Sequence, residues 1–99
     1  MNTVQIEQQI LRVICQGFTD GPIAPSALAR LENYRWSSAS HEAIFRALWP
    51  MRGRPAELIR KQLPARLTRA GFPDLYWEDL FEPHGLSREE AGQLLGDSF

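Results

Sequence analysis

The chain has 99 residues and a formal net charge of −1, with 43% hydrophobic and 23% charged residues. Such a chain is long enough for one small hydrophobic core, and its composition excludes wholesale disorder. One cysteine, Cys15, excludes an internal disulfide, and the apolar runs are too short for a membrane span.

The first two predicted elements are short helices. An apolar stripe at helical spacing predicts an amphipathic helix with Thr3 as its N-cap and Gly17 as its end. A turn follows, and Pro25 suits the first position of a second helix. The residues expected to face inward are Ile6, Ile10, Val13, Ile14, Leu28 and Leu31.

Two further helices are expected in the middle of the chain. Three serines at 37, 38 and 40 offer N-cap oxygens to a third helix, which Pro50 ends. From Pro55 the apolar phase continues across Pro64, which predicts either one kinked helix or two short helices in line. The expected core positions are Ile44, Phe45, Leu48, Ile59, Leu63, Leu67 and Ala70.

The last third is predicted to hold two more elements. Pro73 would open a helix that buries Leu75, Trp77, Leu80 and Phe81. A final helix over residues 87–96 begins with a capping box, in which the side chains of residues 87 and 90 bond to each other's backbone N–H groups. With no stretch alternating at period two, we predict an all-α fold: one compact bundle of five to six short helices spanning residues 1–99.

The charge is unevenly distributed along the chain. Residues 35–72 carry eight basic and two acidic residues, whereas residues 73–99 carry one basic and seven acidic residues. Such asymmetry indicates either an interaction surface or two segments that neutralise each other in the fold. We expect mutual neutralisation, because helices adjacent in sequence usually pack together.

The search for catalytic chemistry finds no complete motif. His41-Glu42 lacks the second histidine four residues later that a zinc-protease helix needs, and His84 is far along the chain. Cys15 lies on an apolar helix face, where a thiol stays protonated. The glycines form no phosphate-binding loop. We therefore expect no enzyme, with no catalytic residue, no metal site and no cofactor, in a soluble cytoplasmic protein without a signal peptide or membrane segment.

Binding is the remaining class of function, and two segments qualify. Exposed Trp, Tyr and Arg are typical anchors of protein interfaces. This favours the connector between the second and third predicted helices, which carries two aromatic residues, and the loop expected after Pro50, which carries two arginines. The predicted partner-binding residues are Tyr34, Arg35, Trp36, Arg52 and Arg54. The alternative is a small DNA-binding regulator that uses the basic stretch 52–69 to bind phosphates.

The order of several segments resembles a known family. "EQQILRVI" (7–14), "LARL" (28–31), "YRW" (34–36), "HEAIFRAL" (41–48) and "ELIRKQLPARLTRAGFPDL" (57–75) follow one another in the chain. Together they look like the N-terminal domain of DnaB-type replicative helicases, which shares its fold with the helicase-binding C-terminal domain of bacterial primases. The resemblance covers residues 7 to about 81.

This resemblance implies a helical bundle that works by docking. Its expected partner is the replicative helicase or primase, or a second copy of the chain. The sequence carries no Walker lysine and no primase catalytic portion, so helicase activity does not transfer. The resemblance implies packing roles for His41, Ile44, Phe45 and Leu48, and it marks no docking residue.

Overall fold

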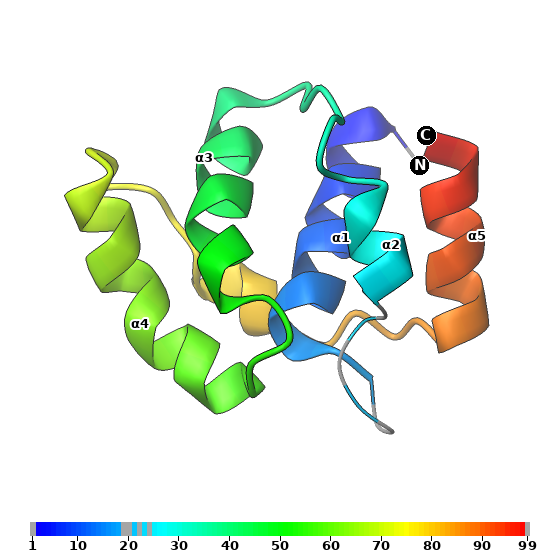
Figure 1. Ribbon diagram of the computed structural model, residues 1–99. Coiled ribbons are helices and arrows are strands. Elements are labelled where there is room, and N and C mark those ends of the chain that lie inside the picture. Colours follow the sequence, from blue (N-terminus) through cyan, green and yellow to red (C-terminus); the bar gives the residue numbers. More distant parts are fainter. Residues whose placement is uncertain (1, 19–20, 22, 24, 99) are drawn as a thin grey trace.

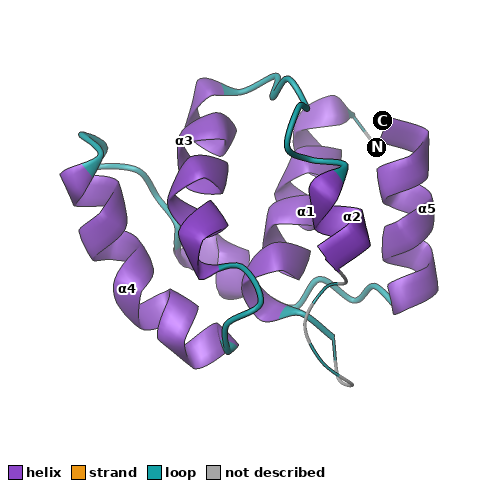
Figure 2. Ribbon diagram, in the orientation of Figure 1, coloured by secondary structure: helices purple, strands orange, loops and turns teal. Residues whose placement is uncertain are grey.

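The computed structural model describes residues 2–18, 21, 23 and 25–98, and of residues 95–98 the backbone alone. Within these ranges the chain forms helices and turns, with no strand. The fold is therefore all-α, as predicted (Figure 2). The α-helices are α1 (Thr3–Gln16), α2 (Pro25–Ala29), α3 (Ala39–Leu48), α4 (Ala56–Arg69) and α5 (Arg88–Ser98), and two short 3-10 helices are η1 (Trp49–Met51) and η2 (Glu78–Phe81).

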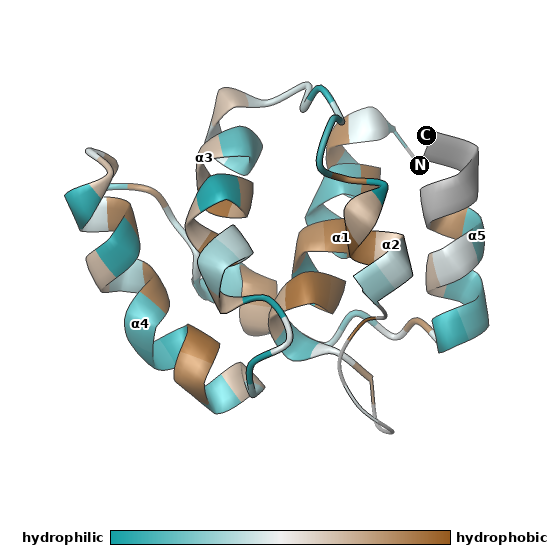
Figure 3. Cartoon of the chain, viewed as in Figure 1, coloured by the Kyte–Doolittle hydropathy of each residue, from teal (hydrophilic) through white to brown (hydrophobic). Residues whose placement is uncertain are grey.

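The first helix is the centre of the bundle. It packs against α3, α4, α5 and η2. Figure 1 shows α3 and α5 on either side of α1, with α4 on the far side of α3. Hydrophobic residues are dense along α1 (Figure 3), and its Leu11 is fully buried in the same core cluster as Leu31 and Leu63 from other segments. No described helix is both long and apolar enough to cross a bilayer.

The helix ends follow local capping rules, with one correction. The N-cap of α1 is Asn2, one residue before the predicted Thr3. The reason is Gln5, which stands three residues after Asn2, so that the two side chains bond to each other's backbone N–H at 2.9 and 3.1 Å. Gly17 ends α1 with a φ of 67°, as predicted.

The other predicted caps are confirmed. Ser38 is the serine that caps α3. Ser87 and Glu90 form the expected capping box, with bonds of 3.1 and 3.2 Å, and α5 begins at the next residue after Ser87. The helix predicted over 87–96 is thus α5.

The fourth helix is continuous. It runs through Pro64, so the one-helix alternative holds and the two-helix alternative does not. Because proline has no N–H, the carbonyl of Arg60 loses its helical partner at this point. The loop expected after Pro50 is shorter than predicted, since Met51 belongs to η1 and is buried.

The helix predicted from Pro73 does not form. Only η2 is helical there. Residues 73–74 form a turn and residues 75–77 have no regular secondary structure, with Leu75 and Trp77 half-buried and Tyr76 67% exposed between them. Leu75 and Trp77 are two positions apart, which on a helix would place them on opposite sides. In the irregular segment both pack against the core.

The expected neutralisation between the basic and acidic segments is not observed. The ion pairs found among described residues are His41–Glu7 and Arg46–Glu42, and neither joins residues 35–72 to residues 73–99. Figure 1 shows α4 and α5 at opposite ends of the bundle. Since α1 and α3 pack between them, the acidic first turn of α5 lies away from the arginines of α4.

Candidate functional site

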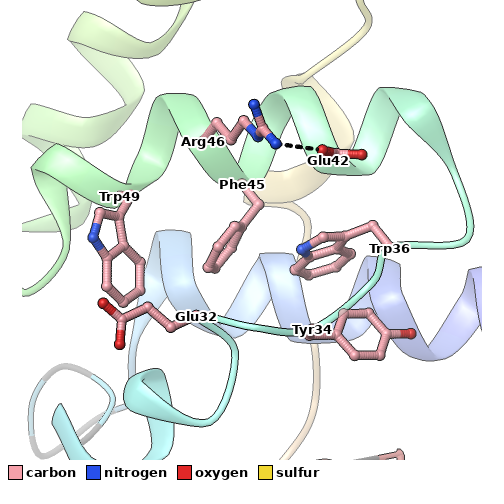
Figure 4. A pocket seen from close by; sticks show the side chains of 7 residues that line it. All are labelled: Glu32, Tyr34, Trp36, Glu42, Phe45, Arg46 and Trp49. Carbon is pink, nitrogen blue, oxygen red and sulfur yellow. Dashed lines mark ion pairs between the residues drawn. The ribbon is translucent and has the colours of Figure 1, made fainter.

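Four aromatic rings form a continuous row along one side of α3, which we call the aromatic row: Tyr34, Trp36, Phe45 and Trp49. Successive ring centroids are 5.0, 5.0 and 5.3 Å apart. Figure 4 shows Trp49, Phe45 and Trp36 in a row beside α3, with Tyr34 next to Trp36 at the end of the row. Phe45 is 7% exposed, whereas the other rings are half-buried. The row therefore has a buried centre and accessible ends.

Two simple periodicities build this row. Phe45 and Trp49 are four residues apart, so they lie on one face where α3 passes into η1. Tyr34 and Trp36 are two residues apart in the non-helical connector, and alternation places both on the same side of the chain. Helix and connector thus present their rings to each other.

A buried carboxylate fixes the connector in place. Glu7 of α1 is fully buried and accepts hydrogen bonds from the Tyr34 hydroxyl at 2.6 Å and from the Ser37 N–H and hydroxyl at 2.8 and 2.9 Å. Its other neighbour is His41 of α3, whose Nδ1 lies 3.0 Å away. One acidic side chain therefore ties together α1, the connector and the start of α3. We call this set the Glu7 network.

The Glu7 network shifts the acidity of its members. Burial raises the pKa of the Glu7 carboxyl, but the hydrogen bonds from Tyr34, Ser37 and His41 outweigh it and hold the pKa below its ordinary value. Burial, followed by the bond to Glu7 and its charge, raises the pKa of Tyr34 to about 12. The network is thus built for an ionised glutamate and a neutral tyrosine.

The predicted partner-binding residues are only partly brought together. Tyr34 and Trp36 are in contact, and Arg52 reaches the same surface through Trp49, with its guanidinium carbon 4.4 Å from the ring centroid. The side chains of Arg35 and Arg54 are exposed, and neither lines the pockets around the row.

Two contiguous open pockets flank the row. The first has a volume of about 240 Å³ and runs over the aromatic rings; it is lined by Glu32, Tyr34, Trp36, Glu42, Phe45, Arg46 and Trp49. The second, of about 460 Å³, includes Arg52, Leu28 and Pro25. Glu32 and Trp49 line both. We call this combined surface the aromatic face.

Sequence reasoning missed two members of the aromatic face. Trp49 was not among the predicted partner-binding residues, yet it is half-buried and joins the two pockets. Its position beside Pro50, where the helix stops, was the available signal for an exposed ring. Glu32 carried no signal, because only the fold brings it opposite Trp49.

A second surface lies between α3 and α4. This groove, of about 380 Å³, is lined by Arg46 from α3 and by Arg66 and Arg69 from α4, with Phe72 at 43% exposure. We call it the arginine groove. Two other arginines of the basic stretch contact aromatic rings instead: Arg52 lies over Trp49, and the guanidinium carbon of Arg60 is 5.3 Å from the ring centroid of Phe81.

The histidines and the cysteine are held in structural contacts. His84 accepts a bond from the Leu86 N–H through Nδ1, so its Nε2 carries the proton that is donated to the Gly17 carbonyl. The Cys15 thiol is buried, and burial, aided by the charge of Asp79, raises its pKa to about 12. Across the described residues, no three histidine, cysteine or acidic side chains come together as a metal-binding group.

Comparison with known proteins adds no assignment. No family model, no curated protein and no solved structure matches the chain. The function must therefore be argued from the aromatic face, the Glu7 network and the arginine groove themselves.

Proposed function

We propose that this protein is a non-catalytic interaction module that docks a protein partner on its aromatic face. The observation that carries the proposal is the aromatic row, which ends in Trp49. The Trp49 ring is half-buried, and the Arg52 guanidinium lies over it. Trp, Tyr and Arg are the residues that most often supply binding energy at the centre of protein interfaces. Here all of them occur on one surface beside two open pockets.

The rigidity of this surface also suits docking. The connector that bears Tyr34 and Trp36 is held by bonds to Glu7, so its rings need little ordering when a partner arrives. A surface fixed in advance loses less conformational entropy on binding, which leaves more of the contact energy as affinity.

The non-catalytic part of the proposal rests on the state of the reactive side chains. Cys15 is buried with a raised pKa and is therefore a poor nucleophile. His84 has both ring nitrogens engaged by backbone groups, and His41 is engaged by Glu7. The side chains that most often act as bases and nucleophiles therefore take part in structural contacts or are buried in the core.

The resemblance to DnaB-type helicase and primase domains directs the choice of partner. We propose a replication protein, either the replicative helicase or the primase of the encoding organism, with a second copy of the chain as the other candidate. In such an arrangement the chain would supply a docking surface, and the partner would supply any catalysis.

Binding of the immobilised protein to the purified helicase and primase tests this proposal. We expect binding that Trp49→Ala weakens about tenfold or more, because loss of a central anchor typically costs over 1 kcal/mol. Tyr76→Ala is the matched control, since Tyr76 is a more exposed aromatic on another segment. Far-UV circular dichroism confirms that both variants remain folded.

The possible outcomes separate the partners. Equal loss of binding in the two variants would count against the aromatic face. Binding of neither replication protein, with light scattering showing a dimer that Trp49→Ala dissociates, would leave the second copy as the partner. Absence of both would remove the docking proposal.

The arginine groove favours a second candidate function, nucleic-acid binding. Arg46, Arg66 and Arg69 come from two helices to line one groove, and Phe72 offers an exposed ring on which a base can stack. Fluorescence anisotropy with single- and double-stranded DNA would show steep salt dependence if phosphates are bound. We expect Arg66→Ala with Arg69→Ala to abolish such binding and Arg54→Ala to preserve it; salt-independent anisotropy would exclude this function.

A further inference from the structure

The pocket above the aromatic row has an acidic character. Its charged lining residues are Glu32, Glu42 and Arg46. Glu42 and Arg46 neutralise each other through an ion pair of 2.7 Å, whereas the Glu32 carboxylate has no hydrogen-bond or ion-pair partner within the described part of the chain. Figure 4 shows Glu32 on one side of the ring row and the Glu42–Arg46 pair on the other. Within this pocket the Glu32 carboxylate is therefore the charge left without an ion pair, and Arg52 lines only the neighbouring pocket.

Two contacts within the protein show that arginine guanidinium groups stack on its aromatic rings. The guanidinium of Arg52 lies over Trp49 at 4.4 Å, and that of Arg88 lies over Phe18 at 4.6 Å. Arg52 lines the second pocket and not the first, whereas Trp49 lines both. The part of Trp49 that borders the first pocket is thus left uncovered by Arg52.

We propose that this pocket receives an arginine side chain of the protein partner. The guanidinium would stack on Trp49 and pair with the Glu32 carboxylate, and the aliphatic part of the side chain would lie along Phe45 and Trp36. An indole face attracts cations through its quadrupole, and a nearby carboxylate adds a charge-assisted hydrogen bond. This inference rests on the proposed docking function and names the chemistry of the partner at the same surface.

Arginine fits this pocket better than lysine for two physical reasons. The planar guanidinium is weakly hydrated and stacks on aromatic rings, whereas an ammonium holds its water strongly. The guanidinium also presents several donors in one plane, so it can stack and bind a carboxylate at the same time.

The test uses the folded protein and a small probe. Nα-acetyl-L-argininamide is titrated into ¹⁵N-labelled protein while the indole N–H signals of the three tryptophans are followed by NMR. We expect saturable shifts at Trp49 and Trp36 and none at Trp77, which packs against Phe81 away from the pocket. The equivalent citrulline amide, a neutral isostere, should produce no saturable shift.

Variants and a second probe define the recognition. Glu32→Gln is expected to weaken arginine binding about fivefold, in the range of a partly exposed ion pair. Glu57→Gln, an exposed glutamate on α4, should leave it unchanged. The lysine amide should bind more weakly than the arginine amide. Equal response to arginine and citrulline, equal shifts at Trp77, or identical affinity in Glu32→Gln would each overturn the proposal.

Failure here is distinguishable from failure of the docking function. If Trp49→Ala abolishes partner binding while the arginine amide gives no saturable shift, the docking surface stands and the arginine pocket falls. If the amide binds but no partner does, the pocket stands without the proposed replication role.

Discussion

Glu7 is the residue on which the local structure of the site depends. Its position near the start of a predicted helix did not indicate this structural role, because a carboxylate in the first turns of a helix is usually solvated. The signal was present in its spacing: Glu7 precedes Leu11 by four residues and Ile14 by seven, so it belongs to the buried stripe. What the sequence could not reveal is that Tyr34, Ser37 and His41 would converge to bind it.

We expect Glu7→Gln to lower the free energy of unfolding by about 2–4 kcal/mol. The amide retains one acceptor oxygen, but its NH₂ group faces Tyr34 and Ser37 donors and cannot accept their hydrogen bonds. Urea denaturation measures the change, with Glu57→Gln as the matched control that should differ from the original protein by less than about 0.5 kcal/mol. A similar stability for both variants would show that the network contributes little.

Trp36 illustrates a buried polar atom without a partner. Among the described residues, its Nε1 is a buried side-chain nitrogen that has no hydrogen-bond partner. Trp36→Phe removes this unsatisfied donor along with some apolar area, so we expect a stability within about 1 kcal/mol of the original. Trp36→Ala removes the whole ring and should cost about 2–4 kcal/mol. Equal losses in the two variants, measured by urea denaturation, would contradict this account.

At the scale of elements, the sequence predicts helices wherever one apolar stripe persists. This holds for α1, α3 and α4, whose inward residues were identified from spacing alone, except that Ala70, predicted to be in the core, is exposed just after the end of α4. It fails at residues 73–77, where Leu75 and Trp77 pack on the core from a non-helical segment. There the tertiary contact, not the local periodicity, decides the conformation.

The pockets of the aromatic face could not be predicted for the same reason. Tyr34, Trp36 and Arg52 were found because their residue types are common at interfaces. Glu32 and Trp49 complete the surface only after the turn following α2 packs beside the end of α3. A sequence pattern along one helix carries no information about which loop will face it.

Pro64 offers a test of how far packing overrides local preference in α4. We expect Pro64→Ala to raise the free energy of unfolding by about 1–2 kcal/mol, because alanine supplies an N–H for the Arg60 carbonyl, partly offset by a more flexible unfolded chain. Pro55→Ala is the control: Pro55 is the N-cap of the same helix, where a proline is compatible with the geometry. Thermal and urea unfolding measure both. A loss of stability in Pro64→Ala would show that the proline is required for the shape of the helix.

At the scale of the whole molecule, stability should fall at both extremes of pH. The folded pKa of Glu7 is lowered, so its contribution is present above its unfolded pKa and is lost as the pH falls below about 4. The folded pKa values of Tyr34 and Cys15 are raised to about 12, so their contributions are lost as the pH rises from about 9 towards 12.

Urea denaturation across this pH range tests the losses of stability at acid and at alkaline pH separately. Glu7→Gln should reduce the loss of stability at acid pH and leave the loss at alkaline pH, whereas Tyr34→Phe should reduce only the loss at alkaline pH. If the loss at acid pH is unchanged in Glu7→Gln, other carboxylates are its cause.

The central position of α1 has a consequence for biosynthesis. This helix leaves the ribosome before the other described helices, yet η2 and α5, which pack on it, are translated only after α4. The part of its apolar surface that η2 and α5 cover must therefore stay exposed while more than sixty further residues are added. We expect nascent chains arrested before η2 to be protease-sensitive and to recruit chaperones, and to become resistant once α5 has emerged.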